Sequence, residues 1–530
     1  MQDSYDYIII GSGFGGAVAA LRLAEKGYRV AVLEQGRRYR PQDFPKRNWN
    51  LRKFLWLPKI GLYGIQALTL LKDVFILHGA GVGGGSLVYA NQLLIPPDDV
   101  LDDPSWGQPD WRVTILPYYD KARRMLGATP AQEITVADEL LKECAADIGR
   151  GDTFHVNEVG IYYGEPDLTV PDPYFDGEGP ERTGCIACGA CMTGCRHGSK
   201  NTLDLNYLYL AEQLGVTIIP ETRVSDVRPG GNGYIITTRN SVGLIPRRRR
   251  FQVGGVIFSG GVMGTVKLLH QCKTRGSLAS ISAQLGNITR TNSEALLGVI
   301  ARKKDVDYSA GIAITSGVHP DDNTQIETVR YGKGHDAMAL LTTLLVGGGK
   351  PWPRPLRFLG NIVRHPLTFL RFLVPFGWAR RATILLVMQK IDNYLRLEYK
   401  RRWWRLGGRS MNSNWHTAKK VPSYIPVANE FAQRMGQKIN GRPSSCLPEV
   451  LFNTSTTAHI LGGCVMADSP AEGVINHNGK IHGYDNLYVI DGSVIPANLG
   501  VNPSLTITAV AEYLMDKFPE KDGHGTASSP

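Results

Sequence analysis

Four cysteines lie close together in the chain, at Cys185, Cys188, Cys191 and Cys195. Their spacing, C-x2-C-x2-C-x3-C with small residues between, lets four thiolates converge on one centre, and bacterial ferredoxins hold [4Fe–4S] clusters in this way. Arg196 stands where such loops usually have proline. The spacing predicts a [4Fe–4S] cluster. A zinc ion held by four thiolates and a metal-free loop of redox-active thiols are the alternatives.

The N-terminal residues have the pattern of a dinucleotide-binding unit. Residues 5–10 predict a buried strand, residues 17–26 a helix rich in small residues, and residues 29–34 a second strand. The turn between the first strand and the helix reads Gly11-Ser12-Gly13-Phe14-Gly15-Gly16. Together these pieces form the unit that binds the pyrophosphate of NAD or FAD.

Each glycine of this turn has a physical role. Gly11 permits the tight turn, Gly13 lets a pyrophosphate approach the helix N-terminus, and Gly16 lets the helix pack on the strand. Glu34 ends the second strand, where a carboxylate can accept hydrogen bonds from ribose hydroxyls. On its own, this unit fits NAD as well as FAD.

Three later segments are also rich in glycine. They are residues 79–86, residues 259–261 at the start of a predicted helix, and Asp491-Gly492-Ser493, which follows a predicted strand and precedes a helix over 503–517. All of them are suited to face a nucleotide although they lie far apart in the sequence. We therefore expect an α/β fold with a discontinuous, Rossmann-like cofactor domain and an inserted substrate domain built on a mostly antiparallel sheet.

Composition narrows the class of protein. The 530 residues are 43% hydrophobic and 20% charged, as in ordinary multidomain proteins. The basic excess is local, because residues 350–409 hold fourteen Lys or Arg and two acidic residues. The rest of the chain is near neutral, so we expect no nucleic-acid partner.

No signal peptide precedes the first strand and no long apolar run is present, so we expect a cytoplasmic protein, peripheral at the inner membrane face.

Taken in order, the motifs resemble those of the glucose–methanol–choline (GMC) oxidoreductases, and within them the bacterial cholesterol-oxidase-like branch. The matching segments are the N-terminal turn and residues 81–86, 459–464, 491–493 and 500–503. The resemblance covers most of the chain and implies FAD as the cofactor. It implies these cofactor-binding residues: Gly11, Gly13, Phe14, Gly15, Gly16, Glu34, Gly83, Gly84, Gly85, Ser86, Asp491, Gly492, Asn502 and Pro503.

The resemblance also implies catalytic residues. Oxidation of an alcohol by a flavin needs a base for the hydroxyl proton and a donor for the developing oxygen charge. In the family, a histidine in H-x-L-G-G and an asparagine in N-P have these roles, which carry over to His459 and Asn502. Ile460 departs from the more usual proline. Sterol oxidases of this type also use a glutamate to move a proton during double-bond isomerisation, and Glu327 lies at roughly the matching place.

The implied reaction is oxidation of a bulky hydrophobic alcohol, with a 3β-hydroxysteroid such as cholesterol as the leading substrate. One alternative is a long-chain alcohol dehydrogenase that passes electrons through an iron–sulfur cluster to a carrier protein or a quinone. The other is a membrane-associated electron-transfer or redox-sensing flavoprotein without alcohol turnover. We expect the FAD-binding domain to comprise residues 1–45, 201–300 and 456–518, the substrate region residues 46–200 and 301–455, and a disordered tail residues 519–530.

The basic segment over residues 350–409 is also aromatic. Its bulky residues are Trp352, Phe358, Phe369, Phe372, Phe376, Trp378, Trp403 and Trp404, and prolines interrupt any long helix. Together with residues 46–72, this composition predicts a surface that lies on a bilayer. The alternative is a substrate-domain sheet and lid with solvated arginines. Residues 384–388 predict a core strand.

Overall fold

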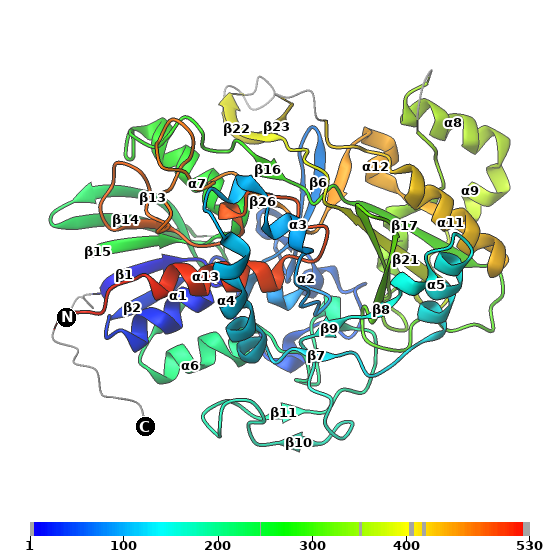
Figure 1. Ribbon diagram of the computed structural model, residues 1–530, viewed down its shortest axis with the longest axis horizontal. Coiled ribbons are helices and arrows are strands. Elements are labelled where there is room, and N and C mark those ends of the chain that lie inside the picture. The colour runs from blue at the N-terminus through cyan, green and yellow to red at the C-terminus, as the bar shows by residue number, and fades with distance from the viewer. Residues whose placement is uncertain (1–4, 244, 349–351, 402–407, 416–419, 523–530) are drawn as a thin grey trace.

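The computed structural model (Figure 1) describes residues 5–243, 245–348, 352–401, 408–415 and 420–522. Trp403, Trp404 and most of the predicted tail lie outside these ranges. Two seven-stranded sheets form the frame of the molecule. The fold is the expected α/β arrangement, with the N-terminal unit in one sheet and an antiparallel sheet beside it.

The first sheet is assembled from distant parts of the chain. β1 (Tyr5–Ile10) lies between β2 (Val30–Leu33) and β15 (Arg248–Phe258) and runs parallel to both. The remaining strands are β12 (Thr217–Ile219), β13 (Thr222–Gly230), β14 (Gly233–Asn240) and β27 (Leu487–Val489). β27 pairs with the end of β15 in parallel, which brings the C-terminal region beside the N-terminal unit. The cofactor-binding fold is therefore discontinuous.

Helices cover this sheet because its strands are apolar on both faces. α1 (Phe14–Glu25) packs against α6 (Tyr207–Gln213) and α13 (Ser504–Asp516), and α13 packs against α4 (Trp111–Leu126). Ile8 and Ile9 of β1 are completely buried. This pattern is typical of parallel strands that have cover on both sides. A further helix, α7 (Gly261–Arg275), begins directly after β15.

The second sheet is antiparallel throughout. Its order is β20 (Thr342–Leu344), β24 (Gly441–Cys446), β17 (Ala295–Ala301), β21 (Ala382–Gln389), β19 (Thr324–Val329), β18 (Ser316–Asp321) and β8 (His155–Val156). The predicted core strand at residues 384–388 is therefore β21, at the centre of the sheet. Leu297 and Val299 of β17 pack on one face against α5 (Val136–Ala146) and α11 (Pro426–Lys438). The opposite face carries Leu296 and Leu386.

A small sheet links the two large ones. β6 (Val74–Gly79) pairs with β5 (Gln66–Leu70) and, in parallel, with β25 (Ser455–Thr457). β6 leads into the second glycine-rich run, which contains the short helix η3 (Gly84–Leu87). β25 ends two residues before His459. Two segments that are far apart in sequence are thus held side by side.

The basic aromatic segment divides into helices and strands. α8 (Arg354–Arg364) and α9 (Pro366–Phe372) are separated at Pro366, and α10 (Trp378–Arg381) leads into β21. β22 (Arg396–Arg401) and β23 (Arg409–Asn414) form a hairpin. In the described residues no helix has both the length and the apolar character needed to cross a bilayer.

Candidate active site

The N-terminal turn is closely packed at three of its glycines. A Cβ at Gly11, where φ is +108°, would lie 2.3 Å from the Ser259 carbonyl oxygen. A Cβ at Gly15 would lie 2.0 Å from the Ile490 carbonyl oxygen, and one at Gly16 would lie 2.1 Å from the Gly11 carbonyl oxygen. These positions therefore require glycine, and they bring the ends of β1, β15 and β27 together.

The second glycine-rich run lies directly against this turn. A Cβ at Gly84 would come within 2.6 Å of the Gly13 Cα, and the Gly83 amide donates a hydrogen bond to Ser12 Oγ at 3.1 Å. A Cβ at Gly13 itself would meet no atom within 4 Å. Open space beside the N-terminus of α1, bordered by glycine backbone, fits a pyrophosphate group. The structure thus brings together the segments predicted to bind FAD.

Two polar side chains of the predicted cofactor set already have protein partners. Glu34 is buried; its Oε1 accepts from the Gly36 amide at 2.7 Å and its Oε2 from Ser12 Oγ at 2.9 Å. Burial raises the pKa of Glu34. Each carboxylate oxygen can accept a further bond, so a contact with ribose stays a prediction. Ser86 Oγ donates to the Gly83 carbonyl oxygen at 2.7 Å and supports the loop.

The space beside the N-terminus of α1, which we call the cradle, is bordered by the two glycine-rich segments. Asp491 fixes a third segment near it. Its carboxylate accepts from the Ser493 amide at 2.8 Å and from Thr265 Oγ1 of α7 at 2.6 Å. Pro503 immediately precedes α13. The N-termini of α1, α7 and α13 thus belong to the segments that meet here, and their amide ends favour an anionic ligand.

The three predicted catalytic residues come together although they are distant in sequence. Asn502 Nδ2 donates to Glu327 Oε2 at 3.3 Å. The charge of His459 lowers the pKa of Glu327, and the charge of Glu327 raises that of His459. Asn502 Oδ1 is buried and has no partner among the described residues. A buried polar atom of this kind fits a bound cofactor or substrate as its partner.

Glu327 is held in β19 with no exposure to solvent. Its Oε1 accepts from Asn157 Nδ2 and from Gln325 Nε2, each at 2.9 Å. Burial raises the pKa of Glu327 to about 7, although these hydrogen bonds oppose the shift. A carboxyl group with this pKa can both give and take a proton near neutral pH.

His459 contacts a second buried carboxylate that the sequence did not indicate. Its Nδ1 lies 3.1 Å from Oε2 of Glu294, which is completely buried. Burial lowers the pKa of His459, but the neighbouring Glu294 and Glu327 carboxylates together outweigh burial, so the net shift of the pKa is upward. The nearby carboxylate favours a proton on Nδ1, which leaves Nε2 as the atom that can accept a proton from a substrate.

Glu294 belongs to a short connection that supports both catalytic segments. Its carboxylate accepts from Thr457 Oγ1 at 2.7 Å and from the Ala458 amide at 3.2 Å. Two residues earlier, Asn292 accepts from the Gly500 amide and donates to the Val501 carbonyl oxygen, each at 2.9 Å. The only sequence signal was a pair of polar residues before an apolar strand, which does not point to residues 459 or 502.

We expect Glu294→Gln to slow flavin reduction by about 10- to 100-fold, since partners that orient a functional histidine have effects of this size. Loss of the carboxylate charge also lowers the pKa of His459, so the acid limb of the pH profile should move to lower pH. Stopped-flow flavin reduction across pH measures both effects. Glu512→Gln, which changes a completely buried carboxyl group on α13 that pairs with Arg22, is the matched control. An unshifted profile in Glu294→Gln would contradict the assignment.

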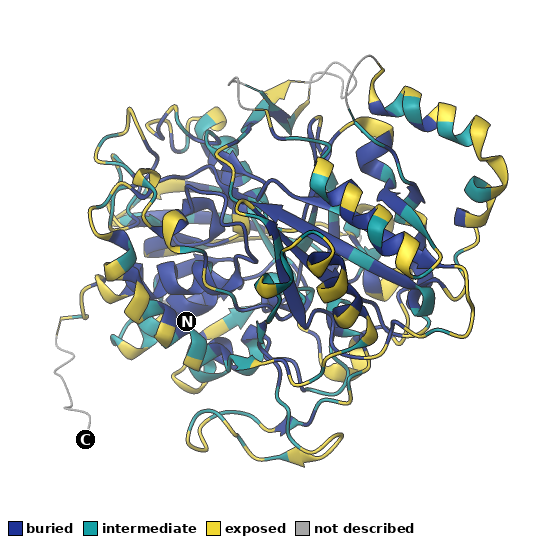
Figure 2. Cartoon of the chain, turned by 45° about the vertical axis from the view of Figure 1, so that its right-hand side comes forward, coloured by how far each residue is buried: buried dark blue, intermediate teal, exposed yellow. Residues whose placement is uncertain are grey.

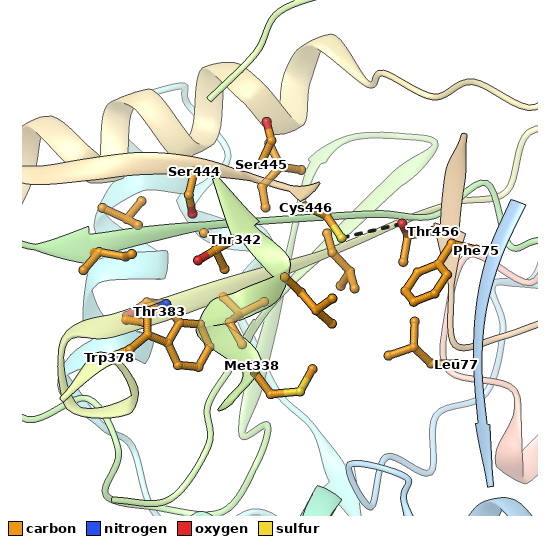
Figure 3. Close-up of a pocket in the computed structure, with 18 residues that line it drawn as sticks. Phe75, Leu77, Met338, Thr342, Trp378, Thr383, Ser444, Ser445, Cys446 and Thr456 are labelled. Carbon is orange, nitrogen blue, oxygen red and sulfur yellow. Dashed lines mark hydrogen bonds between the residues drawn. The ribbon is translucent and has the colours of Figure 1, made fainter. Parts of the chain in front are cut away.

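An apolar cavity lies beside the second sheet (Figure 3). Its wall includes Phe75, Leu77, Leu296, Gly298, Ile300, Met338, Trp378, Ile384 and Thr456. Leu296 pairs across the sheet with Leu386, which pairs with Glu327. Directly opposed residues share a face, so the cavity opens on the face that carries Glu327. The cavity therefore suits an apolar molecule on the face of the sheet that carries Glu327.

The predicted metal site is not supported. Cys185, Cys188, Cys191 and Cys195 line one small cavity, but their side chains range from exposed at Cys188 to buried at Cys191. Among the described residues, no group of three or more His, Cys, Asp or Glu side chains is placed to hold a metal ion. Spacing allowed the four sulfurs to converge, but the folded loop does not bring them to one point. The expected cluster and the zinc alternative thus lack support.

Comparisons with known proteins agree with this geometry. A family profile described as GMC oxidoreductase matches residues 393–511, and one described as FAD binding domain matches residues 6–42. The chain is 46% identical to a cholesterol oxidase of Acinetobacter baumannii, over 98% of this chain and 95% of that protein. A cholesterol oxidase of Mycobacterium tuberculosis is also 46% identical, over 98% of this chain and 92% of that protein.

A solved structure, a pyridoxine 4-oxidase, shares the fold with a TM-score of 0.62 at 15% identity, over 97% of this chain and 99% of that one. The protein belongs to the GMC oxidoreductase family. It is an FAD-dependent alcohol oxidoreductase, as the motifs indicated. The cradle at the N-terminus of α1 fits the pyrophosphate of this cofactor.

Proposed function

We propose that the protein oxidises the 3β-hydroxyl of a sterol to the ketone. The observation that carries the proposal is the apolar cavity, whose wall residue Leu296 shares a sheet face with Glu327, the carboxylate that accepts from Asn502. Near-full-length similarity to proteins named cholesterol oxidase supports the substrate class. The apolar wall of the cavity favours a large apolar substrate, while the polar side chains His459, Asn502 and Glu327 act on the hydroxyl end of that substrate.

The side chains divide the chemistry between them. FAD, when bound in the glycine-rich cradle, would supply the hydride acceptor for oxidation of the carbinol carbon. His459 takes the hydroxyl proton on Nε2, and Glu294 stabilises the resulting imidazolium. The amide of Asn502 donates to the substrate oxygen as its charge develops. The apolar wall excludes water and orients the substrate toward these groups.

This assignment is tested by adding substrate under anaerobic conditions and following the flavin absorbance. A 3β-hydroxysterol should bleach the flavin in stopped-flow mixing, and a 3α-epimer, which presents the hydroxyl on the other face, is the matched control. A long-chain primary alcohol tests the alternative substrate class. Faster reduction by the primary alcohol than by the sterol would overturn the proposal.

We further propose that Glu327 moves a proton when the double bond of the steroid isomerises. Its carboxylate must take a proton, so the isomerised fraction of the product should fall as pH drops below about 7, where Glu327 is protonated. Glu327→Gln should abolish isomerisation while flavin reduction stays within about tenfold of the wild type. Chromatography of the products measures both from one reaction. An isomerised product from this variant would contradict the role.

A further inference from the structure

Two helices at the margin of the molecule present apolar side chains to solvent. α8 and α9 lie at the outer edge of the second sheet, and much of their surface is exposed (Figures 1 and 2). Eight large apolar side chains on and beside them are 55% to 80% exposed, and they include Trp352, Leu359, Val363, Leu367, Leu370 and Phe376. We call these six residues the apolar face. Exposed apolar side chains gathered on two neighbouring helices are typical of an interaction site.

The surroundings of the apolar face are cationic. Residues 337–391 contain eight Lys or Arg and no Asp or Glu. Arg364 and Arg371 are exposed on the two helices. Arg442 has three arginines near it, Arg302, Arg371 and Arg381, and burial together with these like charges lowers the pKa of Arg442. An exposed cluster of like charges is complementary to an anionic partner.

The inner side of the same helices reaches the substrate cavity. Phe358 of α8 and Phe372 of α9 are buried in one apolar cluster with Trp378 and Ile300. Trp378 and Ile300 also line the cavity. The buried side of α8 and α9 is therefore continuous with the apolar cluster that lines the cavity.

We propose that the apolar face and the arginines around it dock onto an anionic lipid bilayer, from which a lipid-dissolved alcohol passes into the cavity. The passage of the alcohol from the bilayer into the cavity rests on the proposed function. Apolar side chains insert at the headgroup boundary while arginines contact lipid phosphates. A second copy of the chain fits this face less well, because a two-fold interface would place the arginine cluster against itself.

Sedimentation of the holoenzyme with lipid vesicles tests the docking. The wild type should bind vesicles of equal phosphatidylcholine and phosphatidylglycerol, and bind pure phosphatidylcholine vesicles more weakly. Val363→Asp/Leu367→Asp should weaken the partition by about tenfold or more through loss of insertion. Arg364→Glu/Arg371→Glu should weaken it by a similar factor, since each basic residue near an anionic surface contributes severalfold. Raised salt should reduce binding of the wild type.

Matched control variants carry an apolar-to-Asp or an Arg-to-Glu substitution at exposed positions outside α8 and α9. Val113→Asp on α4 and Arg248→Glu on β15 alter residues that are equally exposed, so they should bind vesicles like the wild type. The double variants should reduce their flavin normally with detergent-solubilised sterol and more slowly with sterol in vesicles.

Double variants that bind vesicles like the wild type would overturn the docking proposal. If these variants instead changed from dimer to monomer in sedimentation velocity, with no change in vesicle binding, the face would be a contact between copies of the chain and the proposal would also be overturned. If no sterol reduces the flavin but vesicle binding responds as described, the proposed substrate is wrong and the docking surface stands.

Discussion

His459→Gln should reduce the rate of flavin reduction by about 10²- to 10⁴-fold, the usual effect of losing a general base. Glutamine can donate and accept hydrogen bonds at this place but cannot take a proton near neutral pH. The buried Glu294 carboxylate, 3.1 Å from Nδ1, would then lie beside a neutral amide instead of a potential imidazolium. Single-turnover stopped-flow mixing with saturating substrate isolates this step from binding and product release.

The flavin absorbance of the same sample provides the first control, because the FAD cradle is formed by other segments and the variant should retain its cofactor. His270→Gln is the matched substitution. His270 lies on α7, contacts the Leu397 carbonyl oxygen at 3.2 Å, and burial lowers its pKa to about 4. That variant should reduce its flavin normally. A His459→Gln enzyme with a wild-type rate would exclude His459 as the base.

The second large effect is expected for Asn502→Ala. Removal of one donor to a developing oxyanion costs about 10²- to 10³-fold in rate. The Asn502 amide also donates to Glu327 at 3.3 Å and lowers the pKa of that carboxyl group. Its loss should therefore raise the pKa of Glu327 further, and the acid limb of the isomerisation profile should move to higher pH. Flavin reduction and product analysis across pH measure the two consequences separately.

Asn429→Ala is the matched control for this change. Asn429 is buried on α11 and donates to the Val346 carbonyl oxygen, away from the catalytic residues. An equal loss of activity in both variants would show that Asn502 acts through stability alone. A rate change without any shift of the isomerisation profile would separate Asn502 from Glu327.

The N-terminal unit could be predicted because its residues are local. Strand, turn and helix periodicity are short-range properties, and Gly11 and Gly16 have steric roles that depend on the elements directly around them. The structure confirmed the α/β fold and the convergence of the distant glycine-rich segments. The family resemblance added His459, Asn502 and Glu327, which the fold places together.

The prediction of a metal site is not supported by the described residues, for the opposite reason. Sequence spacing sets which distances are possible, but backbone conformation decides where each thiol points. Cys188 is exposed and Cys191 is buried, although only two residues separate them. A spacing pattern alone could not distinguish a ligand set from a loop whose cysteines line one cavity without the arrangement that a metal ion needs.

The sequence by itself determined the cofactor-binding unit, the discontinuous fold and the class of chemistry, because those depend on local patterns and on motifs in a fixed order. Only the tertiary structure decided which groups surround the catalytic residues. Glu294 reaches His459, and Asn292 holds the segment before Asn502, through contacts between residues more than 150 positions apart. Burial, which no local pattern specifies, then raises the pKa of Glu327 to about 7.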